Sequence, residues 1–204
     1  MKQRKAQFER KSKETDIKIT LNVDGQGKAK IKTNIGILDH MLELFTFHGF
    51  FDLDLNVKKA DLNIDIHHTN EDVGIVLGKA FKEALGDKEG IKRFGHGFAP
   101  MEGTLGRCVI DISGRGFLKF HVEDHAKAAT LNQDGYAFAY LEHFLESFAH
   151  SIGATINIQV TGLSEDLHTN LETIFKSLGL ALDDATRIEP KRKGIVPSTK
   201  GIID

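Results

Sequence analysis

The chain has 204 residues, of which 27 are basic and 29 acidic, and 40% of its residues are hydrophobic. This length is enough to bury a core in one large domain or two small ones. A formal charge of -2 without a long basic block argues against a protein that binds nucleic acid by neutralising phosphates. No run approaches the roughly 18 apolar residues of a membrane span, and the charged segment 1–15 lacks the apolar region of a signal peptide. The single cysteine, Cys108, cannot form an internal disulfide, so we expect a cytoplasmic protein.

The first half of the chain alternates between strand-like and helix-like patterns. Apolar residues at every second position, bounded by turn residues, predict half-buried strands. The expected strands lie at 17–23, 29–31, 52–57 and 63–66. Helical spacing of apolar residues predicts a helix of about three turns over 38–45. A second helix is expected from about His67 to Leu85, closed by Gly86.

The second half gives the same order of elements. Strands are expected at 108–112, 117–122 and 155–160, and helices at about 136–151 and 168–182. Three glycines inside the predicted helices, Gly74, Gly78 and Gly179, are expected to permit close packing. Cys108 falls in an apolar strand and is expected to be a small buried hydrophobe.

The two halves also resemble each other in sequence. Residues 38–45, LDHMLELF, match 141–148, LEHFLESF, at an offset of 103, and the same offset pairs 52–57 with 155–160. After a two-residue slip, 67–81 lies over 168–182. We therefore predict an α+β fold of two duplicated β-β-α-β-α half-domains, at about 10–90 and about 104–185, followed by a tail at 186–204. Helices are expected on one face of each sheet.

A histidine and glutamate motif stands at the start of the helix that begins near His67. His67 and Glu71 are four residues apart and share a helix face, with His68 beside Glu71 at three residues. Two imidazoles and a carboxylate at a helix end can bind a divalent first-row metal. The alternative interpretation is a solvated helix start whose acids complement the helix dipole.

The repeat favours the metal interpretation. The same residue types recur at the equivalent places of the second half, which surface solvation does not explain. The recurring positions are His168 and Glu172 in the later helix, and His40 and His143 in the preceding helices.

Six stretches of the chain are distinctive in combination. They are LDHML (38–42), HHTNEDVGIVLGKAFKEALGDKEGIKRFG (67–95), IDISGRGFL (110–118), EHFLESFA (142–149), ETIFKSLGLAL (172–182) and VPSTKGII (196–203). Together they resemble the imidazoleglycerol-phosphate dehydratase family of histidine biosynthesis, from about Arg10 to the C-terminus. The resemblance implies a single dehydratase domain spanning 1–204, with a helical bundle sandwiched between two mixed β-sheets.

The resemblance also implies an activity, a cofactor and an assembly. The activity is that of a hydro-lyase that dehydrates imidazole-glycerol phosphate, a small phosphorylated imidazole, to imidazole-acetol phosphate. It implies two Mn²⁺ ions per active site with ligands from neighbouring subunits, and a large homo-oligomer built from trimers. The metal ligands carried over by position are His40, His67, His68, Glu71, His143, His168 and Glu172.

The family's phosphate-binding and catalytic positions have matches as well. Basic and hydroxyl groups that suit phosphate oxygens fall at Arg93, Arg115, Lys176, Ser198 and Lys200. The matched catalytic carboxylates are Glu14, Glu71 and Glu172, of which Glu14 corresponds to the family's N-terminal catalytic glutamate. We expect phosphate and a neighbouring subunit to order the tail that carries Ser198 and Lys200.

The chain departs from the family pattern in three places. Thr169 stands where a second histidine is expected, Gly103 replaces a glutamate after Glu102, and the loop before His168 is longer than usual. A hydroxyl is a poor substitute for imidazole, so we predict one tight and one weakened metal site. The same departures support an alternative: a catalytically impaired paralogue that acts as a ligand-binding or assembly subunit.

Overall fold

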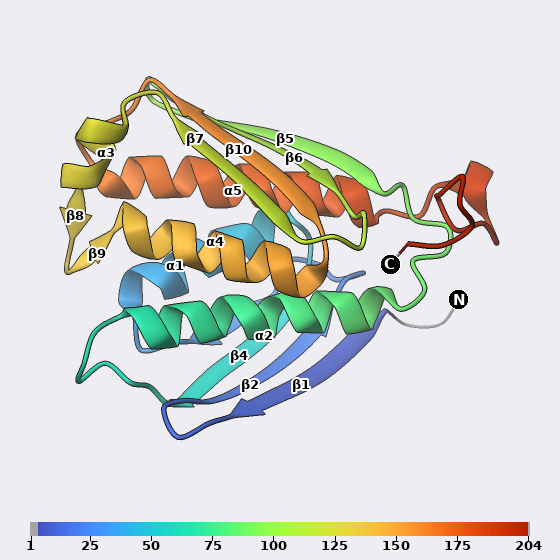
Figure 1. Cartoon of the computed structure of the whole chain (residues 1–204), viewed down its shortest axis with the longest axis horizontal. Helices are drawn as coiled ribbons and strands as arrows, with labels where there is room; N and C mark the ends of the chain where they lie inside the picture. The colour runs from blue at the N-terminus through green and yellow to red at the C-terminus, as the bar shows by residue number, and fades with distance from the viewer. Residues whose placement is uncertain (1–3, 204) are drawn as a thin grey trace.

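The computed structural model describes residues 4–203, so the first three residues and the last residue of the expected domain lie outside the described residues. Four long helices form a layer between two four-stranded sheets (Figure 1). The first sheet has the order β1 (Lys5–Lys11), β2 (Asp16–Asn22), β4 (Asp52–Lys59), β3 (Ala29–Lys32). The second has the order β5 (Phe94–Met101), β6 (Thr104–Asp111), β10 (Thr155–Thr161), β7 (Phe117–Val122). The long helices are α1 (Gly36–His48), α2 (His67–Leu85), α4 (Phe138–Ile152) and α5 (Leu167–Thr186).

The two sheets have the same topology, which confirms the duplication and the α+β class. Each has one parallel pair, β3 with β4 and β7 with β10, and its other pairs are antiparallel. Each half begins with one strand more than the sequence predicted, β1 and β5. The second half also contains short elements between β7 and α4, namely α3 (His125–Thr130), β8 (Asn132–Gln133) and β9 (Tyr136–Ala137).

The missed strands lack the pattern that identifies a strand. In β1, KAQFERK, only Ala6 is buried, because this strand lies at the edge of the first sheet. In β5, two inward positions are glycines, so no alternating apolar side chains appear. The strand expected at 63–66 is wrong: residues 62–64 form a turn, Ile64 is 73% exposed, and Asp65 accepts a hydrogen bond from the His67 N–H at the entry to α2.

Glycines allow the helix layer to close tightly. A Cβ at Gly95 would lie 2.1 Å from the Ala181 carbonyl oxygen, so α5 packs directly on the backbone of β5. A Cβ at Gly78 would lie 2.7 Å from the Phe148 oxygen, and one at Gly179 2.6 Å from the Phe45 oxygen. The predicted packing role of the helix glycines is therefore confirmed between α2 and α4 and between α5 and α1. Cys108 is fully buried in β6, as expected.

The starts of the helices and the C-terminal tail lie at opposite ends of the molecule. In Figure 1, α2, α4 and α5 all begin on the left, and the tail that follows α5 folds back on the right. A short 3₁₀ helix (Pro190–Arg192) and a bridge between Ile188 and Ile91 hold this tail against the chain. Within residues 4–203, none of the helices combines the length and apolar character that crossing a membrane requires.

Candidate metal centre and phosphate-binding residues

Two histidines and one glutamate meet between α1 and α5, and we call these three residues the His40 group. His168 Nε2 lies 2.9 Å from Glu172 Oε1, and His40 Nε2 lies 3.5 Å from the same oxygen. The two rings stack with their centroids 5.1 Å apart. Lys176, one turn after Glu172, donates to the other carboxylate oxygen. Burial raises the pKa of Glu172, but hydrogen bonds from Lys176, His168 and His40 outweigh it and hold the pKa below its usual value.

A second group of the same composition lies between α4 and α2, and we call it the His143 group. Nδ1 of His143 lies 2.9 Å from Nδ1 of His67, with ring centroids 4.6 Å apart. His67 Nε2 lies 3.4 Å from Glu71 Oε2. Two facing imidazole nitrogens either share one proton or, as neutral bases, present two lone pairs to one cation.

The two groups are equivalents in the duplicated fold. Each takes one histidine from the middle helix of one half and a histidine-glutamate pair from the last helix of the other half. The pairing across halves follows from the packing of α1 on α5 and of α4 on α2. Imidazole nitrogens and a carboxylate oxygen are the donors that divalent first-row metals accept. The donor atoms of the His40 group lie within 4.8 Å of one another and fit such an ion, whereas His67 faces His143 with one ring nitrogen and Glu71 with the other.

His68 lies beside the His143 group, with its ring centroid 5.7 Å from that of His67, but it binds a different carboxylate. Its Nδ1 is 2.9 Å from Asp61 Oδ2, and Asp61, His68 and Glu14 hold their nearest donor atoms within 4.8 Å of one another. The hydrogen bond to the Asp61 carboxylate raises the pKa of His68 above its usual value, with Glu14 and Asp65 adding to the shift. A carboxylate on the second ring nitrogen orients a metal-binding histidine and strengthens it as a ligand. Asp61 was not expected from the sequence, because it lies in a polar run before the helix and has no distinguishing motif.

Thr169, the counterpart of His68, is turned inward. It is 5% exposed, and its hydroxyl donates to Asp166 Oδ2 over 2.9 Å. Asp166 caps α5 by also accepting from the backbone N–H groups of His168 and Thr169. These hydrogen bonds prevail over burial and hold the pKa of Asp166 below its usual value. The hydroxyl of Thr169 therefore serves the helix cap.

Arg93 stands at the other end of the molecule, at the start of β5. Its Nε donates to Asp111 Oδ1 over 2.7 Å, its Nη2 to Asp111 Oδ2 over 3.2 Å, and its Nη1 to the Pro197 carbonyl over 2.9 Å. Its backbone has φ = 76°, in the left-handed region that L side chains rarely adopt. The Arg93 guanidinium thus ties the tail, one residue before Ser198, to the second sheet. Asp111 is a further residue that sequence reasoning missed.

The expected phosphate-binding residues are divided between different parts of the molecule. Lys176 binds Glu172 of the His40 group, Arg115 is exposed in the turn between β6 and β7, and Lys200 is exposed in the tail. The Ser198 hydroxyl accepts from the Lys200 N–H over 3.2 Å. The single chain brings together Arg93, Ser198 and Lys200 on one side, and Lys176 with the histidines on the other.

The remaining residues considered in the sequence lie outside the two histidine groups. Glu102 is exposed in the two-residue turn between β5 and β6, at φ = 50°. His48 ends α1, and burial together with the charge of Lys176 lowers its pKa. His96 Nδ1 lies 3.5 Å from Asp184. Those histidines without a repeat partner are exposed, as expected: His121, His125 and His150.

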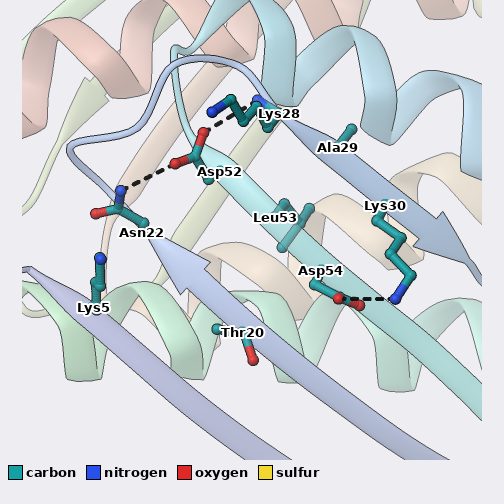
Figure 2. Close-up of a pocket in the computed structure, with 9 residues that line it drawn as sticks. All are labelled: Lys5, Thr20, Asn22, Lys28, Ala29, Lys30, Asp52, Leu53 and Asp54. Atoms are coloured by element: carbon teal, nitrogen blue, oxygen red, sulfur yellow. Dashed lines mark hydrogen bonds and ion pairs between the residues drawn. The ribbon is translucent and has the colours of Figure 1, made fainter.

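A pocket of about 340 Å³ lies on the outer face of the first sheet, away from the helix layer (Figure 2). Lys30 reaches Asp54 there over 3.3 Å, and Asp52 accepts from the Asn22 side chain over 3.2 Å. Figure 2 shows these side chains spread along neighbouring strands. None of the residues that line the pocket belongs to the histidine groups or to the expected phosphate-binding set.

Comparison with known proteins gives one consistent family. The family model described as imidazoleglycerol-phosphate dehydratase matches residues 33–182. The enzyme of that name from Thermoanaerobacter pseudethanolicus is 48% identical over 200 residues, covering 98% of this chain and 100% of the relative. The one from Bacillus subtilis is 46% identical over 202 residues, with coverage of 98% and 100%.

Solved structures agree with the sequence relatives. The crystal structure of imidazoleglycerol-phosphate dehydratase from Staphylococcus aureus superposes with a TM-score of 0.78 at 31% identity, covering 91% of this chain and 99% of that one. The structure from Pyrococcus furiosus in complex with (S)-C348 gives a TM-score of 0.77 at 36% identity, with coverage of 96% and 99%.

Proposed function

Because the chain belongs to the imidazoleglycerol-phosphate dehydratase family, we propose that it is a hydro-lyase of histidine biosynthesis that removes water from imidazole-glycerol phosphate to form imidazole-acetol phosphate. The observation that carries the proposal is the duplicated meeting of two imidazoles with one carboxylate, in the His40 group and the His143 group. With its one cysteine buried and that thiol's pKa raised by burial, the chain suits a reducing compartment, which we propose is the cytoplasm.

The reaction takes a hydroxyl from one carbon of the substrate and a proton from its neighbour. The hydroxyl leaves as water, and the enol that remains tautomerises to the ketone. A carboxylate within hydrogen-bond reach of the carbon-bound proton can take that proton, which balances the proton that the departing hydroxyl needs to leave as water. We assign this role to Glu14, whose carboxylate is exposed to solvent and lies beside His68.

The resident ions of this site are proposed to be Mn²⁺, two per active site. Bound metal would supply Lewis-acid polarisation and a template for the imidazole ring of the substrate. The proposed ligands are His40, His67, His68, Glu71, His143, His168 and Glu172. Glu71 and Glu172 each hold a histidine one turn earlier on the same helix face, which fixes the orientation of that ring.

Cationic and hydroxyl side chains would bind the phosphate of the substrate. Arg93, Arg115, Lys176, Ser198 and Lys200 are the proposed set. Arg93 can serve both the tail and a phosphate, because a guanidinium has five N–H donors and three of them are used here.

The separation of the two residue sets supports self-association. His168 and Ala185, which accepts the Arg93 N–H, are 17 residues apart on α5, or roughly 25 Å at about 1.5 Å per residue. A substrate with a short glycerol chain does not span that distance. We propose that a second copy brings its Arg93 and tail to the histidine groups, within a larger assembly of trimers.

An exposed apolar surface also supports this assembly. Phe94, Phe98, Val109 and Phe117 are each more than half exposed, and all lie on the second sheet. Apolar surface gathered in this way marks protein–protein contacts. If metal ligands come from more than one copy, removal of the metal weakens association. Sedimentation before and after verified demetallation tests this; an unchanged sedimentation coefficient would contradict it.

The activity is tested with the purified full-length chain and added MnCl₂. We expect imidazole-acetol phosphate to form from imidazole-glycerol phosphate, and metal analysis to find Mn²⁺ bound. Thr169 gives the second candidate a specific basis, because its hydroxyl is committed to the helix cap. If the chain binds the substrate but gives no turnover under saturating Mn²⁺, it is an impaired paralogue that acts as a binding or assembly subunit.

A further inference from the structure

We propose that Asp72 is a positioning residue that holds the loop carrying Glu14 beside His68. The inference rests on the proposed function, in which Glu14 handles the substrate proton. Asp72 follows Glu71 in the histidine motif, yet it belongs to neither of the histidine groups. Its role would be to fix where the Glu14 carboxylate stands.

Asp72 is 5% exposed, and both of its carboxylate oxygens are occupied by the hairpin of β1 and β2. Arg10 Nε, from β1, donates to Oδ1 over 2.8 Å. The hydroxyl of Thr15, which is fully buried, donates to Oδ2 over 2.5 Å. A buried carboxylate needs such partners, because an unpaired buried charge is strongly destabilising. One carboxylate therefore fixes both sides of the hairpin to α2.

Hydrogen bonds also close the loop between these two anchors. The Ser12 hydroxyl accepts from the Glu14 N–H over 3.1 Å and from the Thr15 N–H over 3.0 Å. The Ser12 N–H donates to the Thr15 carbonyl over 2.9 Å, and Lys59 Nζ binds the Lys13 carbonyl. Glu14 thus stands on a closed loop whose position on α2 depends on the Asp72 carboxylate.

The geometry of α2 places Asp72 one turn away from His68, the side chain beside which Glu14 lies. His68 and Asp72 are four residues apart on α2 and share one face. Asp72 holds the hairpin one turn after His68, and the Glu14 carboxylate reaches the side chains of His68 and Asp61. Loss of the anchor would let Glu14 move relative to His68.

The second half lacks this arrangement. The counterpart of Asp72 is Thr173, whose hydroxyl donates to the Asn170 carbonyl of its own helix. The corresponding turn contains only Glu102 and Gly103, and Thr104 donates to the Gly162 carbonyl. The ion pairs between helix and sheet in the second half join Asp184, near the end of α5, to Lys92 and His96. Among residues 4–203, a charged anchor from the start of the helix to the hairpin turn is therefore found in the half that carries Glu14.

The test compares Asp72→Asn with Asp52→Asn in the full chain with MnCl₂. Asn keeps the shape but loses the charge, and its amide can accept only one of the two hydrogen bonds. A misplaced catalytic group typically lowers the rate by about ten- to a hundredfold, so we expect kcat of Asp72→Asn to fall in this range with KM within about threefold. Asp52 also anchors a loop of the first sheet, through the Gln26 and Lys28 N–H groups, but at the other end of β2. Asp52→Asn should leave kcat unchanged.

Hydrogen exchange separates positioning from general destabilisation. In Asp72→Asn the amides of Glu14 and Thr15 should exchange faster, while those of α2 keep their protection. Thr15→Ser retains the hydroxyl, so this variant should keep the wild-type rate of exchange and kcat. Thr15→Val lacks the hydroxyl and should resemble Asp72→Asn. Unchanged exchange at Glu14 and Thr15 in Asp72→Asn would overturn the proposal, as would unchanged kcat in an active enzyme. If the wild type gives no turnover, the proposed function fails, and the exchange result still decides whether Asp72 holds the loop.

Discussion

The starts of α2 and α5 are duplicates that use one position in opposite ways. Each places a histidine and a glutamate one turn apart, and each receives a histidine from a helix of the other half. At the next position, His68 points out toward Asp61 and Glu14, whereas Thr169 turns in and bonds to Asp166. The two halves therefore share the scaffold and one histidine-glutamate pair per helix, while the position after the histidine is an imidazole bound to Asp61 in one half and part of a helix cap in the other.

The physical reason is the competition between capping and ligation. A threonine near the start of a helix can bond back to the residue that caps it, and such cap interactions stabilise by about 1 kcal/mol. In the first half Asp65 accepts from the His67 N–H, and the cap residue Ile66 makes no side-chain hydrogen bond to the helix. The first half thus keeps an imidazole available for chemistry, and the second half keeps a better satisfied helix start.

The arginines before the first strand of each half show the same contrast. Arg4 forks onto Asp24 and donates to the Thr186 carbonyl, as Arg93 forks onto Asp111 and donates to the Pro197 carbonyl. Arg4 ties the chain to the end of α5, but Arg93 ties down the segment that carries Ser198. Equivalent contacts therefore stabilise in one half and, in our proposal, also bind phosphate in the other.

Replacing the two unlike positions by alanine gives the largest expected difference. His68→Ala removes an imidazole that no neighbouring ligand replaces, and we expect activity to fall below about one per cent, consistent with the 10- to 100-fold loss for outer groups of metal sites as a lower limit. Thr169→Ala removes one cap hydrogen bond, so its main effect should be a loss of about 1 kcal/mol in unfolding free energy. Steady-state assays with added Mn²⁺ and urea unfolding measure both. Equal losses of activity would show that Thr169 takes part in the chemistry after all.

The arginine pair predicts the next largest difference. Arg93→Ala and Lys200→Ala each remove a charged contact worth about 1.5–3 kcal/mol, or one to two decades in KM. Arg4→Ala is the matched control: it breaks the same kind of fork, so it should lower stability while KM stays within about threefold. A normal KM in both Arg93→Ala and Lys200→Ala would mean that the phosphate assignment is wrong.

Replacing Thr169 by histidine makes the two helix starts alike, and we expect this change to have a smaller effect, a gain in metal affinity. Thr169→His should raise the affinity of the weaker Mn²⁺ site by about tenfold or more, since one more imidazole joins the ligands. The gain is reduced because the substitution removes the hydrogen bond to Asp166. Calorimetric titration of wild type and variant measures the two sites. Two equally tight ions in the wild type would sink the idea of a weakened site, and equal activity of the two proteins would show that another group has taken the ligand role.

Much of the scaffold was predictable because its elements carry periodic apolar residues. Helix α2 was placed at the residues where it is found, and the duplication followed from matching blocks. Strand β5 was missed because Gly95 and Gly97 replace the inward side chains that define a strand pattern. At that strand, the close approach of α5 decides the structure, and a single sequence does not display this contact.

The candidate site was predictable only in its ligand types. The repeated histidines and glutamates meet in two groups, as their equivalent places suggested. Three carboxylates that support candidate site residues were not predicted: Asp61, Asp72 and Asp111. Asp61 lies in a polar run, and Asp72 and Asp111 bind residues that are distant in sequence. The inward turn of Thr169 depends on the loop geometry around Asp166, which residue spacing does not give.

The smallest expected difference between the two halves is in the pH dependence of stability that the loops at the far ends of the central strands contribute. In the first half Asp52 accepts from the Gln26 and Lys28 N–H groups and from Asn22; burial raises its pKa, but these hydrogen bonds prevail and hold the pKa below the usual value. In the second half the neutral Ser113 hydroxyl holds the Arg115 backbone and approaches Thr155.

Only the first of these loops should therefore respond to acid. The folded-state pKa of Asp52 lies below the unfolded value of about 3.9, so its stabilising contribution is complete above that pH and is lost as the pH falls through the folded value. Urea unfolding from about pH 6 down to about pH 3 should show a shallower loss of stability for Asp52→Asn than for the wild type. Ser113→Ala should lower stability by the same amount at every pH. Parallel curves for Asp52→Asn and the wild type would show that the Asp52 carboxylate does not make the loop of the first half sensitive to acid.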